Sequence, residues 1–267
     1  MSDKPVACVT GASSGIGWQT ALAFAARGYG VTLAARRRER MEELADLCRQ
    51  AGGEPLVAPT DVAEAAQVQA MADRTLEQFG RLDVLVNNAG YGMFERVHEI
   101  DEAALRRIFD VNFFGLWYGC KAVAPIMIRQ RRGHIFNVSS VIGRRGTPFH
   151  GAYCATKFAV IGLTDSMRVE LRPYGIRVTA VLPALTDTEF FQQSVRGQKA
   201  QSSFQKFKRL TPPHAVARKI VASVGRNKPE LVFTLGGKLL VLLSALSPRL
   251  TDKMMQAYFA DLVKKLG

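Results

Sequence analysis

Cysteine and histidine are both scarce in this sequence. The cysteines form no CxxC pair and are scattered along the chain, as are the histidines, which show no metal-ligand spacing. Scattered cysteines are typical of small core residues in a protein of the reducing cytosol, and not of a disulfide framework. We therefore expect a cytoplasmic protein without a metal site. The residues concerned are Cys8, Cys48, Cys120 and Cys154, together with His98, His134, His150 and His214.

Long hydrophobic runs are missing as well. The longest uncharged apolar stretch covers residues 239–248, about half of what spans a bilayer. Residues 1–5 carry no hydrophobic segment of a secretory signal. We therefore expect neither a membrane-spanning helix nor a signal peptide. A length of 267 residues favours one large α/β domain with a sizeable core over two small domains.

Acidic residues are outnumbered by basic ones, 23 against 36, which leaves a formal net charge of +13. A nucleic-acid surface is one interpretation of this excess, but no nucleic-acid motif accompanies it. Solvated helix faces and a site for a phosphate-bearing ligand explain the excess better, and attraction to anionic lipid is a further alternative. The basic groups lie at residues 36–38, 129–132, 144–145, 199–209 and 264–265.

A glycine-rich turn is the most informative stretch of the chain. Residues 10–17, TGASSGIG, follow an apolar run and precede a helix-type run, which predicts a strand, a loop and a helix. The loop amides and the helix dipole of such a unit favour an anion. Gly11 suits the tight turn, Gly15 the close approach of a phosphate, and Gly17 the packing of helix on strand. We predict a dinucleotide pyrophosphate site, although the spacing differs from the common G-x-G-x-x-G and an ordinary loop is the alternative.

Strand-type and helix-type segments alternate along the rest of the chain, with short turns between them. This order predicts a parallel sheet covered by helices on both faces. Without an internal repeat or linker, we expect residues 1–267 to form a single doubly wound, Rossmann-type α/β domain. After the first unit, the expected strands cover residues 29–35, 54–58, 82–86, 133–139, 176–182 and 230–234, and the expected helices cover 36–50, 64–79, 101–130, 153–172 and 214–224.

The end of the second expected strand indicates the type of cofactor. An acidic residue there holds the ribose hydroxyls of NAD, whereas a nearby arginine suits the 2′-phosphate of NADP. The sequence reads Ala34-Ala35-Arg36-Arg37, with no acid. Because a guanidinium binds a phosphate through paired hydrogen bonds, we predict NADP over NAD, with Arg36 at the phosphate. The alternative is that these arginines only begin a solvated helix.

A tyrosine and a lysine four residues apart, Tyr153 and Lys157, indicate acid–base chemistry. On a helix this spacing puts both side chains on one face. A phenol titrates near 10 in water, and a nearby ammonium lowers that pKa towards a useful range. Ser140 could donate a hydrogen bond to a substrate oxygen. Taken alone, such a pair is more often a surface neighbour.

In combination, these residues resemble the short-chain dehydrogenase/reductase superfamily over roughly residues 4–190. The matching elements are the turn at residues 10–17, Asp61, the Asn-Asn-Ala-Gly run at 87–90, Asn112, Ser140, and the Tyr153–Lys157 pair. The resemblance implies that Tyr153 is the general acid or base. Lys157 would hold the nicotinamide ribose and lower the tyrosine pKa, Ser140 would position the substrate oxygen, and Asn112 would hold a water in a proton relay.

The same resemblance implies a set of cofactor contacts. Asp61 and Val62 would contact the adenine, and residues 88–90 would line the cofactor cleft, with Asn88 mostly architectural. The family commonly has Pro-Gly after the sixth strand, where this chain has Pro183-Ala184, so a turn that needs a positive φ would have to adjust. The full set is Gly11, Ser13, Ser14, Gly15, Ile16, Gly17, Arg36, Asp61, Val62, Asn88, Ala89, Gly90, Tyr153, Lys157, Pro183, Thr186 and Thr188.

The substrate side and the tail are less constrained. Residues 185–210 have the place and length of the family's substrate lid, and Arg144 and Arg145 are either loop charges or ligands of an anionic substrate group. Residues 235–267 form an apolar and amphipathic C-terminal extension. In the helix expected from Leu250, apolar residues recur on one face, which suits packing on the domain or a partner subunit, or a membrane-surface contact. Those residues are Leu250, Met254, Met255, Tyr258, Phe259, Leu262, Val263 and Leu266.

The sequence thus predicts an NADP(H)-dependent oxidoreductase that interconverts a carbonyl and a secondary alcohol on a lipophilic substrate, with Tyr153 as general acid or base. The alternative within enzymes is a 3-oxoacyl thioester reductase. The alternative of another class is a non-catalytic nucleotide-sensing protein, although this chain retains both Tyr153 and Lys157. We expect a homodimer or homotetramer, no nucleic-acid partner, and a cytoplasmic location, with a peripheral membrane contact through the C-terminal helix as an alternative.

Overall fold

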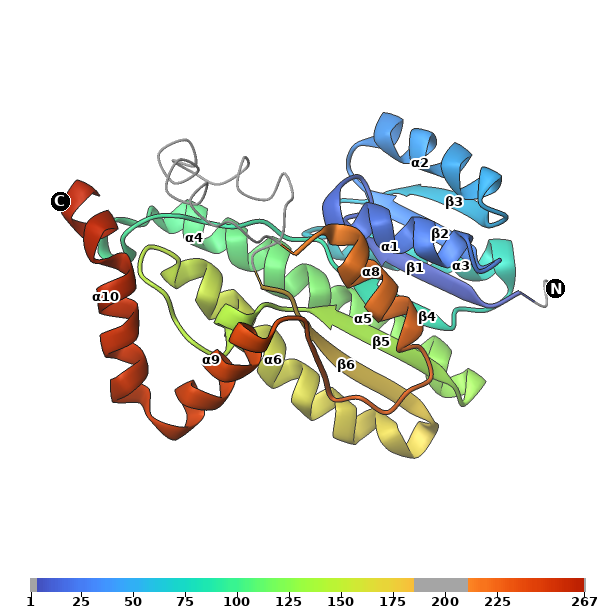
Figure 1. The fold of residues 1–267 in the computed structure, drawn as a ribbon. Helices are drawn as coiled ribbons and strands as arrows, with labels where there is room; N and C mark the ends of the chain where they lie inside the picture. Colours follow the sequence, from blue (N-terminus) through green and yellow to red (C-terminus); the bar gives the residue numbers. More distant parts are fainter. Residues whose placement is uncertain (1–3, 185–210, 267) are drawn as a thin grey trace.

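The computed structural model describes residues 4–184 and 211–266. A seven-stranded parallel sheet forms its centre, in the order β3-β2-β1-β4-β5-β6-β7 (Figure 1). The chain moves outward from β1 to β3, then crosses back to β4 on the other side of β1, which makes the fold doubly wound. The strands are β1 Val6–Thr10, β2 Gly30–Ala35, β3 Glu54–Pro59, β4 Val84–Asn87, β5 Gly133–Val138, β6 Ile176–Leu182 and β7 Glu230–Val232.

The central strands are buried on both faces. Every residue of β1, β2 and β4 is buried, which explains why these strands read as continuous apolar runs and not as alternating ones. In the parallel register, Val9 of β1 lies beside Leu33 of β2 on one side and Val86 of β4 on the other. The register brings the carboxyl ends of these strands to one edge of the sheet.

Helices cover the two faces of the sheet as two separate core layers. One layer contains α1 Gly15–Ala25, α2 Arg38–Gln50 and α8 Pro213–Ala222. The other contains α3 Ala65–Phe79, α5 Gly115–Gln130 and α6 Gly151–Leu171. Large apolar side chains such as Phe24, Met41 and Met127 are completely buried in these layers. Short 3-10 segments at Val97–Glu99, Val141–Gly143 and Arg172–Tyr174 connect the elements.

The doubly wound fold and the helical C-terminal region are therefore as expected, with one local difference. The long helix expected over residues 101–130 is divided into α4, Glu102–Phe109, and α5 by a π-helical segment at Asp110–Phe114. Single π turns inside helices are frequent at functional sites, because the extra residue redirects a side chain. By length and composition the segment Glu102–Gln130 could cross a membrane, but half of its most apolar window is buried inside the protein, as in core helices.

The C-terminal region adds α9, Leu235–Leu246, and α10, Pro248–Leu266, which project from the body at the end of the molecule away from the N-terminus (Figure 1). Thr234 caps α9 by accepting a hydrogen bond from the Gly237 amide at 3.0 Å. The apolar face expected in α10 is not uniformly buried: Phe259 is buried, whereas Leu250 and Met254 are exposed. The side chains of Tyr258, Leu262, Val263 and Leu266 lie outside the described part of the chain, as does the expected lid at residues 185–210.

Candidate active site

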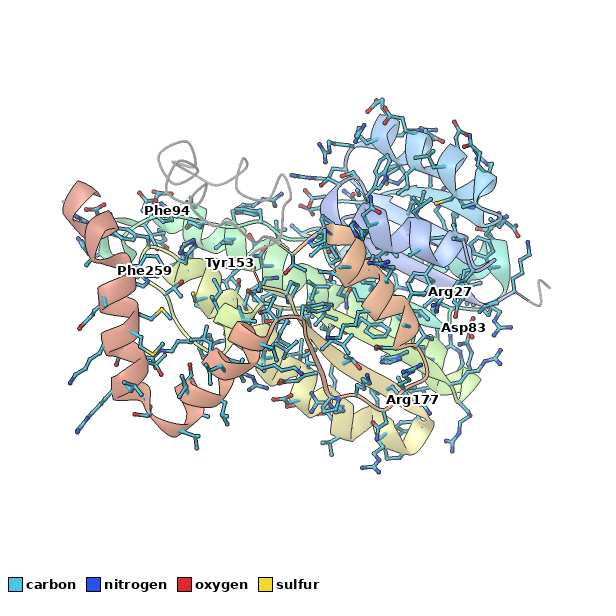
Figure 2. All side chains as sticks on the ribbon, in the orientation of Figure 1. Arg27, Asp83, Phe94, Tyr153, Arg177 and Phe259 are labelled. Atoms are coloured by element: carbon cyan, nitrogen blue, oxygen red, sulfur yellow. The ribbon has the colours of Figure 1, made fainter. Side chains whose placement is uncertain are left out.

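The sequence-predicted site residues converge on the carboxyl edge of the sheet. The glycine turn follows β1, Arg36 follows β2, and Asp61 lies just beyond β3. Asn88 follows β4, Ser140 lies just after β5, and Pro183 follows β6. Ligands of doubly wound folds bind at this edge, where the strand order reverses. In Figure 2, Tyr153 and Phe94 accordingly lie at the opposite end of the molecule from Asp83 and Arg177, which mark the amino ends of β4 and β6.

The glycine loop depends on the absence of side chains. Gly11 and Gly15 have φ angles of +66° and +54°, which favour glycine. A Cβ on Gly17 would overlap the Gly11 carbonyl oxygen, so helix α1 could not approach β1 as closely with any other residue. Ser14 begins α1 in an extended conformation. The loop therefore presents backbone and a helix N-terminus to the site, as an anion cradle requires.

Asn88 locks this loop to the neighbouring strand. Its side-chain amide donates to the carbonyls of Thr10, at 3.0 Å, and Gly11, at 3.3 Å. In return the hydroxyl of Thr10 accepts from the backbone amides of Asn88, at 2.9 Å, and Ala89, at 3.1 Å. The side-chain amide nitrogen of Asn88 is thus engaged by the loop backbone, which supports the expectation that Asn88 is mainly architectural.

The arginines after β2 do not share one role. Arg36 is exposed. Arg37, which the sequence analysis did not select, turns back to the glycine loop and donates to the Ser13 hydroxyl and carbonyl, both at 3.2 Å. Arg38 is exposed and pairs with Glu42 within α2, so it begins a solvated helix. Two guanidinium groups, at Arg36 and Arg37, thus follow the strand that ends beside the loop.

Asp61 has a partner that the sequence did not indicate. Its carboxylate accepts from the Ala63 amide, at 3.1 Å, and from the Arg107 guanidinium of α4, at 2.9 Å. Partial burial raises the pKa of Asp61, but these hydrogen bonds and the positive charges of Arg107 and Arg36 outweigh it and hold the pKa below its usual value. Arg107 lies 46 residues from Asp61 in sequence, and no local pattern connects them.

Tyr153 and Lys157 share a face of α6, and both are buried. The Lys157 ammonium lies 5.6 Å from the centre of the Tyr153 ring and donates to the Val138 carbonyl at 2.9 Å. Burial lowers the pKa of Lys157 to about 8, because desolvation penalises its charged form. Burial raises the pKa of Tyr153, and a hydrogen bond with Ser140 acts in the opposite direction without outweighing it. The structure therefore does not show the lowered tyrosine pKa expected from Lys157, because desolvation dominates.

The two serines after β5 join the strand to α6. Ser139 donates to the Lys157 carbonyl at 2.9 Å. Ser140 bonds with the Tyr153 side chain and lies 3.4 Å from the Pro183 carbonyl. Ala184 does not have a positive φ, since only Arg131 and Phe149 do among the described non-glycine residues. The altered turn is therefore unstrained at this position. Thr186 and Thr188 lie outside the described residues.

Asn112 is completely buried in the π-helical segment. Its side chain bonds both backbone groups of Tyr91, each at 2.9 Å, and also donates to the Thr156 hydroxyl at 3.2 Å. A Cβ on Gly90 would lie 2.9 Å from the Asn112 oxygen and 3.6 Å from the Lys157 nitrogen. Asn112 therefore fixes the loop after β4 against α6.

An aromatic group that the sequence analysis missed stands just before α6. Phe94 stacks on Phe149 with 5.1 Å between ring centres, and His150 contacts Phe94 edge-on. Phe149 has a φ of +64°, which is rare for a bulky residue. The Glu95 amide, which donates to the Phe149 carbonyl at 2.7 Å, holds this conformation. Strained residues of this kind cluster at functional sites.

Arg144 and Arg145 are both engaged in ion pairs. Arg144 pairs with Glu230, the first residue of β7, and lies 3.6 Å from Asp165 of α6. Arg145 pairs with Asp252 of α10 and donates to the Pro248 carbonyl at 3.2 Å. Of the two alternatives for these residues, the structure favours loop charges with a structural role. Within the described residues, no group of His, Cys, Asp or Glu side chains could hold a metal ion.

Known proteins resemble this chain in sequence. The family model described as short chain dehydrogenase matches residues 5–199. An uncharacterized oxidoreductase, YxnA of Bacillus subtilis, is 34% identical over 254 residues, which cover 94% of this chain and 71% of that protein. The 3-oxoacyl-[acyl-carrier-protein] reductase FabG of Staphylococcus aureus is 41% identical over 178 residues, which cover 66% of this chain and 72% of FabG.

Solved structures agree with these relatives. A short chain dehydrogenase/reductase from Burkholderia phymatum in complex with NAD has a TM-score of 0.85 at 30% identity and covers 93% of this chain and 95% of its own. An alcohol dehydrogenase from Thermococcus sibiricus complexed with 5-hydroxy-NADP has a TM-score of 0.77 at 30% identity, with 86% and 96% covered. Together with the site described above, these matches establish that this chain belongs to the short-chain dehydrogenase/reductase superfamily and is an NAD(P)-dependent oxidoreductase.

Proposed function

We propose that this enzyme uses NADP(H) to interconvert a carbonyl and a secondary alcohol on a lipophilic substrate, with Tyr153 as the general acid or base. The observation that carries the proposal is the arrangement of buried Tyr153 and Lys157 with the partly buried Ser140 at the carboxyl edge of the sheet. A hydroxyl pair beside a buried ammonium can exchange a proton with a substrate oxygen and stabilise the charge that results.

The residues of the loop fit a dinucleotide. Positive φ angles at Gly11 and Gly15 shape the loop, and the close approach of Gly17 to the Gly11 carbonyl packs the N-terminus of α1 against it. A loop and helix N-terminus in this arrangement suit a pyrophosphate. When bound, the nicotinamide supplies or accepts the hydride. The proposed cofactor contacts are those expected from the sequence, with Thr186, Thr188 and a lid at 185–210 included, to which we add Arg37.

The roles of the catalytic side chains follow from their contacts. In the direction of reduction, Tyr153 donates its proton to the substrate oxygen, and Ser140 holds that oxygen by a hydrogen bond. The Lys157 ammonium, 5.6 Å from the tyrosine ring, favours the phenolate left behind. In oxidation Tyr153 accepts the proton. Asn112 keeps the loop at residue 91 in place, and in the proposed relay it also holds a water.

The preference for NADP rests on charge. Arg36 and Arg37 both follow β2, no acidic residue lies at this position, and Arg37 already contacts the loop through Ser13. A guanidinium pair attracts a 2′-phosphate, whereas an NAD-type site uses a carboxylate there. Because the solved relatives include complexes with NAD as well as with an NADP derivative, the preference needs a direct test.

The test is fluorescence titration of NADPH and NADH on the wild type, on Arg36→Ala/Arg37→Ala and on Arg38→Ala. The double variant should weaken NADPH binding tenfold or more and leave NADH binding unchanged. Arg38→Ala is the matched control, because Arg38 pairs with Glu42 on the exposed side of α2, and it should bind both cofactors like the wild type. Equal wild-type affinity for the two cofactors would refute the preference for NADP.

The substrate class is proposed from the surroundings of Tyr153. Tyr153 packs in an apolar cluster with Met93 and the partly buried Tyr91 and Ile142, and apolar surroundings suit a lipophilic ketone, aldehyde or alcohol. A 3-oxoacyl thioester is the second candidate, favoured by the similarity to FabG over 178 residues. Comparing NADPH oxidation with a 3-oxoacyl thioester and with simple lipophilic ketones distinguishes the two candidates.

Assembly and location complete the proposal. We propose a single domain that forms a homodimer or homotetramer in the cytoplasm. The partly exposed aromatic side chains of Phe114 in the π-helical segment, Trp117 on α5 and Phe158 on α6 support an interface between copies. A peripheral contact of the C-terminal region with a membrane surface belongs to the same proposal. The molar mass in solution, by light scattering, tests the oligomeric state.

A further inference from the structure

Helix α9 has apolar side chains on two opposite sides. One side packs on the body of the enzyme: Val241 belongs to a cluster with Val141 and Leu182, and a Cβ on Gly237 would lie 3.0 Å from the Val141 side chain. The other side is exposed and continues into the start of α10. A helix that is apolar all round is normally buried in a core or in lipid, so the exposed side needs a partner.

The exposed leucines of α9 form one stripe, and two exposed apolar residues, Leu250 and Met254, follow at the start of α10; we name this set the leucine face. Positions three or four residues apart lie on one side of a helix, and the α9 leucines keep this spacing with exposed fractions between 54% and 84%. Contiguous apolar patches of this kind mark interaction sites, unlike single exposed leucines. The leucine face consists of Leu235, Leu239, Leu242 and Leu246 on α9, followed by Leu250 and Met254 on α10.

The charges around the leucine face have one sign. Lys238 on α9 and Arg249 and Lys253 on α10 are exposed, and α9 contains no acidic residue. Asp252, the acid nearest to them in sequence, is paired with Arg145. Lys238 also lies close to Lys219, whose pKa is lowered first by burial and then by the positive charges of Lys238 and Lys228.

We propose that the leucine face docks this enzyme on an anionic lipid surface, with α9 lying in the plane of the interface. Twelve residues make α9 about 18 Å long, too short to cross a hydrocarbon core of about 30 Å. An apolar face bordered by lysines and arginines is the signature of a helix that binds in the headgroup region. Anionic lipid would neutralise these charges, whereas a second copy of the chain would bring the same positive charges together.

Arg145 ties the loop before α6 to the C-terminal helices. This residue lies eight positions before Tyr153, pairs with Asp252 and donates to the Pro248 carbonyl between α9 and α10. The inference deepens the proposed function and rests on its peripheral membrane contact, but not on the identity of the cofactor.

The experiment is sedimentation of the full-length protein with vesicles of phosphatidylcholine alone or with one third phosphatidylglycerol. The wild type should pellet with the anionic vesicles and be released by 0.5 M salt. Leu242→Glu/Leu246→Glu should lose the binding. Lys238→Gln should weaken it about fivefold, since one basic side chain near an anionic surface contributes about this factor. NADPH binding of each variant is measured in parallel and should be unchanged, which separates failure of docking from failure of the oxidoreductase proposal.

The matched control is Leu47→Glu/Leu105→Glu, which makes the same charge change at partly exposed leucines of α2 and α4. It should bind anionic vesicles as well as the wild type does. Absence of wild-type binding, or an equal loss in the control, would overturn the proposal. A wild-type oligomer that dissociates in Leu242→Glu/Leu246→Glu would overturn it too, because the leucine face would then be an interface between copies.

Discussion

Acidification should destabilise this protein in part through a buried histidine, His134 of β5. Its ring is almost completely buried and stacks on Phe136 with 3.9 Å between ring centres. One nitrogen, Nδ1, accepts a hydrogen bond from the Gly225 amide at 3.2 Å, so the other, Nε2, carries the proton and faces the Thr179 hydroxyl at 2.9 Å. Protonating Nδ1 would break the first bond and bury a charge near Arg177.

The size of the effect follows from the pKa. Burial, helped by the positive charge of Arg177, lowers the pKa of His134 from 6.5 to about 3. Below pH 6.5 the unfolded chain therefore binds a proton that the folded chain does not, so the free energy of unfolding falls as the pH falls from 6.5 towards 3. At about 1.36 kcal/mol for each pH unit, the loss is about 2 kcal/mol at pH 5 and about 5 kcal/mol when complete.

The assay is urea unfolding of the wild type and of His134→Gln at pH 7.5 and pH 5.0. Glutamine keeps a donor near Thr179 but does not titrate. The variant should be less stable at pH 7.5, because it loses the stacking on Phe136. Between pH 7.5 and pH 5.0, however, its free energy of unfolding should fall by about 2 kcal/mol less than that of the wild type. Equal losses in both proteins would show that His134 does not titrate on unfolding and would refute the reasoning.

Three further predictions concern the site itself. Tyr153→Phe should lower kcat by about 10²–10⁴-fold, as expected for a general acid, with NADPH affinity within twofold of the wild type; a kcat within tenfold of the wild type would exclude Tyr153 as the proton donor. Gly17→Ala should weaken cofactor binding by about 1–3 kcal/mol in titration, because its methyl group overlaps the loop backbone. The control Gly162→Ala should bind the cofactor normally, because nothing lies within 4 Å of the added methyl group. Arg107→Gln should raise the pKa of Asp61 towards its ordinary value in an NMR titration, and an unchanged pKa would contradict the pairing. The free energy of unfolding should fall by less than about 1 kcal/mol, because the ion pair is partly exposed.

The sequence by itself determined those features that depend on residues close to one another along the chain: the strands, the glycine turn and the spacing of side chains on a helix. Buried parallel strands read as apolar runs, and the glycine turn at residues 10–17 can only be a tight strand-to-helix loop. The four-residue spacing of Tyr153 and Lys157 puts both on one side of a helix wherever that helix lies. Such patterns predict the doubly wound fold, and the resemblance that they carry to the short-chain dehydrogenase/reductase superfamily implies the proposed catalytic residues.

Only the tertiary structure decided how distant residues share their charges and surfaces. Arg37, and not Arg36, contacts Ser13; Arg107 pairs with Asp61 across 46 residues and Arg145 with Asp252 across 107. No local pattern predicts these pairs, because the choice among several equivalent arginines depends on which acid the fold brings within reach. The same holds for the leucine face: α9 reads as an apolar run in sequence, and which of its sides meets the body depends on how the helix docks against Val141 and its neighbours.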